Sequence, residues 1–329
     1  MDDAEHMGRA MQLAASVRSA TAPNPWVGAV LVAADGSTVV GEGATAPPGG
    51  AHAEATALRR AGAAARGATL YTTLEPCSHE GRTPPCIEAI IDAGVARVVV
   101  GVEDPDPHVA GRGLAALTAA RIDVDLGVGA AEVADQLAPY LKHRRTGQPW
   151  VVLKMAASLD ARTAAPDGTS RWITGEEARR DVHRLRADSD AVLVGAGTVR
   201  ADDPELTVRL GDGVEHPQPL RVVLGRAPEG ARVHPALELS GDLGRVLDEL
   251  GRRGVLQVLV EGGARVAHDF HAAGLVDRYV LYLAPVFFGG DDARPLFSGP
   301  GAGTIDDVWK GRLVSVGRLG DDLRVEVAA

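Results

Sequence analysis

The stretch PCSHEGRTPPC occupies residues 76–86, and the tripeptide HAE stands upstream of it at residues 52–54. Zinc in proteins binds imidazole nitrogen and thiolate sulfur, and a catalytic site keeps one of its four positions for water. His52, Cys77 and Cys86 supply one nitrogen and two sulfurs, so they predict an open zinc site with an acidified water. Glu54 lies two residues from His52 and is predicted to move protons as a general base and acid.

The spacing of the two cysteines is longer than in the common pattern of base deaminases, which pair His-x-Glu with Pro-Cys-x-x-Cys. Pro84 and Pro85 predict that a helix begins near Cys86, and a helix N-terminus favours a thiolate. The alternative is a closed zinc site that only stabilises the fold, with His79 as its fourth ligand. The His-x-Glu pair and the Pro-Cys step favour the catalytic site.

Strand and helix patterns alternate on both sides of this stretch, which predicts a layered α/β domain. The predicted strands of the first half are residues 26–33, 39–43, 68–74, 97–102 and 122–126. The predicted helices are residues 4–19, 54–65, 84–93, 113–120 and 130–142.

A polar segment, RRTGQP at residues 144–149, predicts a domain boundary, which gives domains at 1–146 and 147–329. The basic cluster beside it (Lys142, Arg144 and Arg145) is interpreted as a solvated helix end rather than a binding site. The second half alternates again. Its predicted strands are residues 150–157, 191–195, 220–224, 256–260, 277–284, 313–316 and 323–327, and its predicted helices are residues 176–187, 243–252 and 264–273.

The composition is that of a globular protein, with 45% hydrophobic and 24% charged residues among 329. The net charge of −10 disfavours a nucleic-acid partner but allows a small phosphorylated substrate. The first residues are acidic, which disfavours a signal peptide. The sequence has no apolar run long enough for a membrane helix, which disfavours a membrane partner, so we expect a cytoplasmic protein. With only two cysteines, a metal role is expected before a disulfide.

The segment at residues 76–86 resembles the bifunctional riboflavin-biosynthesis deaminase–reductases. NPWVGAV at residues 24–30, GAHAE at 50–54 and GRG at 111–113 fit the same family, and the resemblance continues through the second half. It implies an α/β protein with an N-terminal cytidine-deaminase-like α/β/α domain and a C-terminal dihydrofolate-reductase-like α/β domain.

The resemblance also implies two activities. A zinc-dependent hydrolytic deaminase would act on 2,5-diamino-6-(5-phosphoribosylamino)pyrimidin-4-one, and an NADPH-dependent reductase would then convert the ribosyl group to ribityl. His52, Cys77 and Cys86 would hold Zn²⁺, Glu54 would shuttle protons, and Asn24 would contact the pyrimidine.

One residue departs from the family, which usually has a histidine seven positions before the zinc histidine. Thr45 stands there in this chain. We expect the change to remove one substrate contact and to leave the zinc chemistry intact.

Carried over by position, the resemblance assigns the reductase site as well. The implied NADPH-site residues are Ala156, Trp172, Thr198, Asp202 and Gly263. The implied substrate-site residues are Lys154, Ser170, Arg186, Leu206, Arg209 and Glu261. Arg186 and Arg209 are predicted to clamp the substrate phosphate. The alternative for each is an arginine on the surface of a helix or loop. For Lys154 the alternative is a structural lysine in a salt bridge.

Glycine patterns alone do not locate the nicotinamide cofactor. GAGT at residues 195–198 and EGGA at 261–264 follow predicted strands, where backbone amides suit a phosphate, but ordinary strand-to-helix turns explain them equally well. GRGLAA at residues 111–116 matches a loose dinucleotide pattern, which we interpret as chance because no strand precedes it directly.

Two other functions are alternatives to the bifunctional enzyme. One is a nucleic-acid or nucleoside deaminase with an appended nucleotide-binding domain, which the acidic charge disfavours. The other is a non-enzymatic binding module closed by zinc, which would need four protein ligands on the metal. We expect a homo-oligomer as the assembly.

Overall fold

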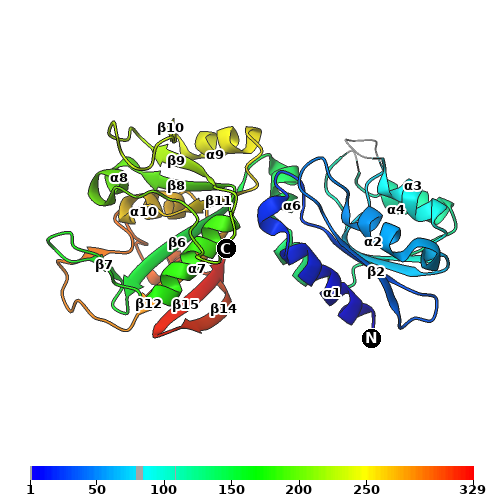
Figure 1. Ribbon diagram of the computed structural model, residues 1–329. Coiled ribbons are helices and arrows are strands. Elements are labelled where there is room, and N and C mark those ends of the chain that lie inside the picture. Colours follow the sequence, from blue (N-terminus) through cyan, green and yellow to red (C-terminus); the bar gives the residue numbers. More distant parts are fainter. Residues whose placement is uncertain (1, 79–83, 108) are drawn as a thin grey trace. The chain divides into compact units, whose positions relative to one another are not determined.

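A computed structural model describes residues 2–78, 84–107 and 109–329 of the chain. The chain divides into two compact units, Met1–Gly147 and Gln148–Ala329 (Figure 1). The division falls within the polar segment at residues 144–149. Gly147 ends the helix before it with a φ of 74°, a left-handed conformation that favours glycine.

The first unit is built on a five-stranded sheet with the order β2-β1-β3-β4-β5. The strands are β1 (Gly28–Val32), β2 (Val39–Ala44), β3 (Thr69–Leu74), β4 (Arg97–Val102) and β5 (Asp123–Leu126). β1 runs antiparallel to β2 and β3, whereas β3, β4 and β5 are parallel. The carboxyl ends of the parallel strands therefore meet at one edge, from which the loops after β3 and β4 depart.

Helices cover both faces of this sheet and make three layers. On one face, α1 (Asp3–Ala15) contacts α5 (Ala130–Gln136). On the other, α3 (Cys86–Asp92) contacts both α2 (Ala53–Ala61) and α4 (Arg112–Ala119). The helix predicted over residues 130–142 is two helices, because α6 (Ala138–Thr146) begins anew after Leu137 with a proline in its first turn.

The second unit is built on an eight-stranded sheet with the order β10-β9-β8-β11-β6-β12-β15-β14. The strands from β10 to β12 in this order are parallel, and β15 runs antiparallel to both of its neighbours, β12 and β14. Their bounds are β6 (Trp150–Ser158), β8 (Ala191–Gly195), β9 (Leu220–Leu224), β10 (Leu237–Leu239), β11 (Gln257–Val260), β12 (Arg278–Ala284), β14 (Arg312–Leu319) and β15 (Asp322–Ala328). A separate ribbon joins β7 (Arg162–Ala164) to β13 (Arg294–Pro295), and neither strand was predicted.

Two hydrophobic clusters lie on opposite faces of this sheet. Leu153 of β6 belongs to the cluster under α9 (Leu243–Arg252) and α10 (Ala264–Ala272). Its neighbour Val152 belongs to the cluster under α7 (Glu176–Ala187). Because successive strand residues point to opposite faces, the apolar parallel strands are buried on both sides.

The turn predicted after β8 is a helix, α8 (Ala196–Asp202), which begins directly at the end of the strand. Only Ala196 and Val199 of this helix are buried, so its sequence carries too little apolar periodicity to be recognised. None of the described helices is long and apolar enough to span a bilayer.

Candidate zinc centre and reductase site

Helix α2 presents one predicted metal ligand and the predicted catalytic residue. His52 is its N-cap, and Glu54 lies in its first turn. The helix lies close against β2, where a Cβ added to Gly43 would lie 2.0 Å from the carbonyl oxygen of Ala53. A Cβ added to Gly41 would lie 2.2 Å from the carbonyl oxygen of Ala57. Glycine in the strand and alanine in the helix thus set the position of His52 and Glu54.

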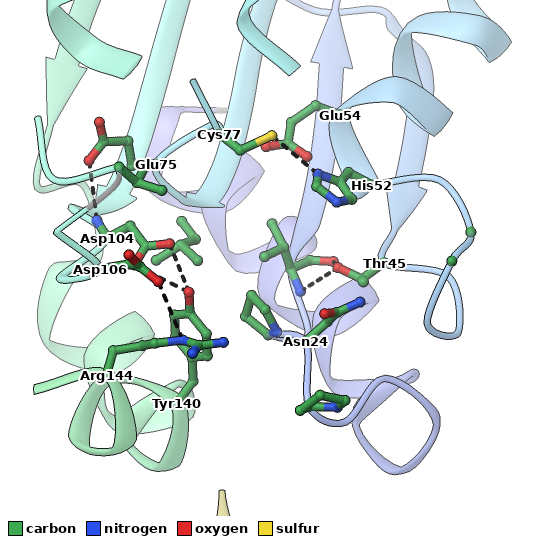
Figure 2. A pocket seen from close by; sticks show the side chains of 17 residues that line it. Asn24, Thr45, His52, Glu54, Glu75, Cys77, Asp104, Asp106, Tyr140 and Arg144 are labelled. Atoms are coloured by element: carbon green, nitrogen blue, oxygen red, sulfur yellow. Dashed lines mark hydrogen bonds and ion pairs between the residues drawn. The ribbon is translucent and has the colours of Figure 1, made fainter. Parts of the chain in front are cut away.

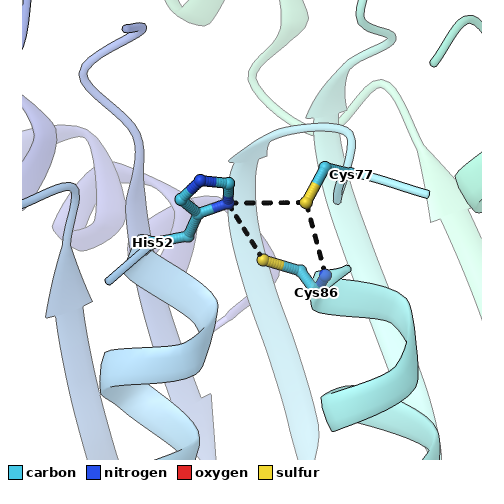
Figure 3. Close-up of side chains that lie close together, drawn as sticks. All are labelled: His52, Cys77 and Cys86. Carbon is cyan, nitrogen blue, oxygen red and sulfur yellow. Dashed lines mark hydrogen bonds between the residues drawn. The ribbon is translucent and has the colours of Figure 1, made fainter. Parts of the chain in front are cut away.

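The two cysteines reach the same place from other elements. Cys77 follows β3, and Cys86 is the first residue of α3. The Nδ1 atom of His52 lies 3.2 Å from Cys86 Sγ and 3.4 Å from Cys77 Sγ (Figure 3). All three ligand atoms lie within 4.8 Å of one another, a spacing that one metal ion can bridge.

This donor set fits zinc and leaves room for a fourth ligand that is not protein. No other histidine, cysteine or acidic residue joins the cluster within residues 2–78, 84–107 and 109–329. His79, the proposed fourth ligand of a closed site, lies outside the described residues.

Hydrogen bonds prepare Cys77 to act as a thiolate. The thiol of Cys86 and the imidazole of His52 hydrogen-bond to it, and the backbone N–H of Cys86 donates to its sulfur at 3.3 Å. Together they lower the pKa of Cys77 to about 4, although burial opposes them. The same contact with Cys77, together with burial, raises the pKa of Cys86.

Glu54 is buried beside the cluster, with only 4% of its surface exposed. Its Oε2 atom accepts a hydrogen bond from the thiol of Cys86 at 3.6 Å. Burial, reinforced by the negative charge of Cys77, raises the pKa of Glu54 to about 7. A carboxyl group with a pKa near neutrality suits both removal and return of a proton. The structure thus brings the four predicted residues together, and their individual roles stay predictions.

A cavity of about 380 Å³ opens in front of the cluster (Figure 2). Such a volume is typical of small-molecule sites. Asn24, the predicted pyrimidine contact, lines it together with His52, Glu54 and Cys77.

Thr45, which the resemblance places where the family usually has a histidine, also lines this cavity. Its buried hydroxyl accepts a hydrogen bond from the backbone N–H of Val27 at 3.0 Å. The side chain therefore links the cavity wall to the residue just before β1. In this chain, position 45 has a structural role instead of offering an imidazole to the substrate.

Glu75 is a further buried carboxylate that lines the same cavity, and the sequence did not predict it. It accepts four backbone N–H groups, from Asp104 at 3.3 Å, Gly111 at 3.0 Å, Gly113 at 2.9 Å and Leu114 at 3.3 Å. Glu75 therefore holds the loop after β4 across the cavity. Because the glycine amides serve this carboxylate, the loose dinucleotide pattern has a structural explanation. An acidic residue at the end of a buried strand, just before Pro-Cys, was the signal available in the sequence.

Arg144 corrects the interpretation of the basic cluster as a solvated helix end. Its side chain is 31% exposed and lines the cavity from α6. The guanidinium carbon lies 5.0 Å from the ring centre of Tyr140, and Nε lies 3.8 Å from Asp106 Oδ2. The hydroxyl of Tyr140 donates to Asp104 Oδ2 at 2.9 Å. Sequence periodicity gave no sign that this helix end faces a cavity.

In the second unit, two of the predicted cofactor residues, Thr198 and Gly263, meet at the carboxyl ends of β8 and β11. The backbone N–H of Gly263 donates to Thr198 Oγ1 at 3.1 Å. In open α/β sheets, ligands bind at these strand ends. Asp202, another predicted cofactor residue, accepts a hydrogen bond from Arg171 at its backbone oxygen, at 2.6 Å. Trp172, which follows Arg171, is 70% exposed, and the Arg171 guanidinium lies against its ring. Ala156 lies on β6.

Three of the predicted substrate residues form a buried ion cluster. Arg186 donates from Nε and Nη2 to the two carboxylate oxygens of Glu261 at 2.6 and 3.0 Å. Lys154 Nζ lies 3.5 Å from Glu261 Oε2. Burial raises the pKa of Glu261, but the charges of Arg186 and Lys154 outweigh it and hold that pKa at about 2. The fork of Arg186 is thus directed at Glu261 rather than outward.

The remaining predicted residues lie in loops. Leu206 is buried with a φ of 54°, and Ser170 is half-buried between β7 and α7. Arg209 is exposed, pairs with Glu205 and donates to Thr207 Oγ1 at 2.6 Å. Their predicted contacts with substrate stay predictions.

Comparison with known proteins identifies both halves. Residues 1–102 match the cytidine and deoxycytidylate deaminase zinc-binding region, and residues 149–325 match the RibD C-terminal domain. The chain is 41% identical to riboflavin biosynthesis protein RibD of Escherichia coli (strain K12), with 98% of each chain covered. It is 44% identical to RibD of Mycobacterium tuberculosis (strain H37Rv), covering 99% of this chain and 97% of the relative.

Solved structures agree. RibD of Acinetobacter baumannii (form 1) superposes with a TM-score of 0.92 at 39% identity, over 99% of this chain and 98% of that one. A Thermotoga maritima protein described as a diaminohydroxyphosphoribosylaminopyrimidine deaminase/5-amino-6-(5-phosphoribosylamino)uracil reductase superposes with a TM-score of 0.88 at 34% identity, over the same shares.

These matches confirm the predicted fold class, a cytidine-deaminase-like α/β/α domain followed by a dihydrofolate-reductase-like α/β domain. The protein is an enzyme that combines a zinc-binding deaminase domain with an NADPH-dependent reductase domain. This outcome favours the bifunctional prediction over a nucleic-acid or nucleoside deaminase. The chain therefore belongs to the RibD family, the bifunctional deaminase–reductases of riboflavin biosynthesis.

Proposed function

We propose that residues 1–146 catalyse the hydrolytic deamination of 2,5-diamino-6-(5-phosphoribosylamino)pyrimidin-4-one. The observation that carries the proposal is the approach of His52, Cys77 and Cys86 to within 4.8 Å beside a buried Glu54. The cavity in front of them has the volume for a small heterocycle. The name of the T. maritima relative specifies the substrate class.

His52 Nδ1 and the sulfurs of Cys77 and Cys86 would hold the zinc ion. When bound, zinc supplies the acidity that makes hydroxide available near neutral pH. Glu54 takes one proton from the attacking water and gives it to the ring nitrogen. It then carries the second proton of that oxygen to the departing amine, which leaves as ammonia. Asn24 contacts the pyrimidine and orients the ring toward Glu54.

Ammonia release from the authentic substrate by the zinc-loaded protein tests this proposal. Cys77→Ala is expected to lose zinc and deamination together, because one ligand of three is removed. The matched control is Ser78→Ala, next to Cys77, which should keep both. Zinc content that stays unchanged in Cys77→Ala would remove this cysteine from the ligand set.

We propose that residues 147–329 reduce the ribosyl group of the deaminated product to ribityl with NADPH. The turns at Thr198 and Gly263 lie at the carboxyl ends of neighbouring parallel strands, the edge at which open α/β sheets bind ligands. Ala156, Trp172 and Asp202 complete the proposed NADPH site. The proposed substrate site comprises Lys154, Ser170, Arg186, Leu206, Arg209 and Glu261.

NADPH oxidation on supplied deaminated product tests the second activity separately from the first. Cys77→Ala is expected to retain this reductase activity, because the metal ligands and the strand ends belong to different units. Absence of NADPH consumption by the wild-type protein would refute the assignment of residues 147–329.

Two finer proposals concern the protein's setting. We propose a homo-oligomer, supported by the exposed Leu313 and Val316 on the edge strand β14, and sedimentation analysis would measure it. We propose the cytoplasm as the location, since a site that needs two reduced cysteines suits a reducing compartment.

A further inference from the structure

We propose that Arg144 binds the phosphate of the deamination substrate. The inference rests on the proposed deaminase function and adds a residue that determines substrate specificity. It is drawn from the charge, the position and the incomplete hydrogen bonding of this guanidinium in the cavity of the first unit.

The described part of the cavity wall is rich in carboxyl groups. The carboxyl groups of Glu54, Glu75, Asp104 and Asp106 all belong to its wall. Among the described residues of this wall, Arg144 is the one that carries a permanent positive charge. A phosphate dianion entering such a cavity is repelled unless a cation receives it, and at short range in a partly buried site that repulsion is large.

The position of Arg144 fits the length of the substrate. The reacting pyrimidine and the phosphate stand at opposite ends of a phosphoribosylated base, with the ribose between them. Glu54 and His52 lie together at one end of the cavity, and Arg144 lies at the other, beside Tyr140 (Figure 2). A substrate with its amine near Glu54 would therefore extend its phosphate toward Arg144.

The guanidinium is held in place but is weakly paired. The Tyr140 ring, 5.0 Å from the guanidinium carbon, supports its plane. The ion pair with Asp106, at 3.8 Å, is longer than the 2.7–2.9 Å of a strong charge-assisted hydrogen bond. The Nε atom is buried without a hydrogen-bond partner among the described residues. A phosphate would supply the strong acceptors that this arginine lacks, in the bidentate geometry that its fork favours.

Arg186 of the second unit shows the opposite arrangement. Its Nε and Nη2 donors are both taken by Glu261 at 2.6 and 3.0 Å. The fork of Arg186 is therefore satisfied within the chain, whereas that of Arg144 is not. The contrast supports Arg144 as an arginine that awaits a ligand rather than one that closes a structural pair.

The test compares Arg144→Gln with the wild-type protein on two substrates. One is the phosphoribosylated diaminopyrimidinone, and the other is the same compound after treatment with a phosphatase. A charge-assisted hydrogen bond to phosphate corresponds to a rise in KM of about 10- to 100-fold when it is lost. We expect this rise for the phosphorylated substrate in Arg144→Gln, little change in kcat, and no change with the dephosphorylated substrate.

Matched variants separate binding from folding. Arg145→Gln removes the same charge from the next, exposed position of α6 and should behave as wild type. Arg144→Lys keeps the charge without the planar fork and should give a KM between those of wild type and Arg144→Gln. Zinc content reports whether each variant is folded at the metal site.

The outcomes distinguish failure of phosphate binding from failure of the proposed deaminase. Equal losses on both substrates, or no loss on either, would overturn phosphate binding by Arg144. Absence of ammonia from the zinc-loaded wild-type protein would instead refute the proposed deaminase. A selective effect of Arg144→Gln on the phosphorylated substrate would support both.

Discussion

Each unit of the chain buries a carboxylate in its site, and the two environments shift the pKa in opposite directions. Glu54 of the first unit is 4% exposed and forms no ion pair with a described side chain, so burial raises its pKa to about 7. The Glu261 side chain of the second unit is 8% exposed, and Arg186 and Lys154 hold its pKa at about 2. Burial is similar in the two sites, so the neighbouring charges decide whether the group exchanges protons or stays ionised.

The largest effect that tests this contrast is expected at Glu54. Glu54→Gln should lower kcat for deamination by about 10²- to 10⁴-fold, because the amide cannot carry the proton. Zinc content should stay unchanged, and so should thermal stability, because a buried carboxyl that forms no ion pair with a described side chain is replaced by a neutral group of equal size. Ammonia release, metal analysis and thermal melting measure the three quantities. Retained deamination would remove Glu54 from the proton path.

At Glu261 the same substitution should act on stability. Glu261→Gln leaves Arg186 and Lys154 buried without their counter-charge, and removing one partner of a buried pair costs about 3–5 kcal/mol. Urea unfolding followed through the second unit should show the loss. Glu249→Gln, in an exposed helical pair with Arg253, is the control and should change stability by less than about 1 kcal/mol. Equal stability of Glu261→Gln and wild type would mean that the cluster contributes nothing net.

The pH dependence of stability sharpens the comparison further. The pKa of Glu261 lies below its ordinary value of 4.5 in the folded state, at about 2. Its contribution is therefore fully present above pH 4.5 and is lost progressively as the pH falls toward 2. The stability gap between wild type and Glu261→Gln should accordingly narrow as unfolding is repeated at pH values from 6 down to 3. A gap that stayed constant would contradict the depressed pKa.

A third buried carboxylate, Glu75, should give the smallest effect of the series. Glu75→Gln keeps one acceptor oxygen and loses the charge, so the four amides that it binds are only partly satisfied. The expected cost is about 1–3 kcal/mol of stability, with a raised KM for deamination because the loop after β4 is loosened. Glu88→Gln, an exposed change on α3, serves as the control. A KM equal to that of wild type would show that the loop is held without Glu75.

Local patterns predicted most of this molecule, and distant contacts account for what they missed. The strands β8 and β9 and the helices α7 and α9 carry clear apolar periodicity and match the predicted ranges. The metal cluster followed from residue types and spacing alone. In contrast, the role of Glu75 depends on amides 29 to 39 residues later, which no local pattern encodes.

The misjudged segments have physical reasons of the same kind. The short ribbon of β7 and β13 joins segments about 130 residues apart, so neither strand has a local signal. Arg144 was assigned to solvent because its environment is set by Tyr140 on its own helix and by Asp106 from another loop. Charge on a helix end is common, and only the packed structure shows which side chain points inward.

The contact between β2 and α2 has a consequence for how activity is lost in this protein. Gly41 and Gly43 carry no functional group, yet one added methyl at either would push against the backbone of the helix that presents His52 and Glu54. Random mutagenesis scored by catalysis would therefore find inactive variants in a strand that never touches the reactants. Engineers who wish to widen this enzyme's substrate range should leave those two positions alone and diversify the loops on the far side of the cavity.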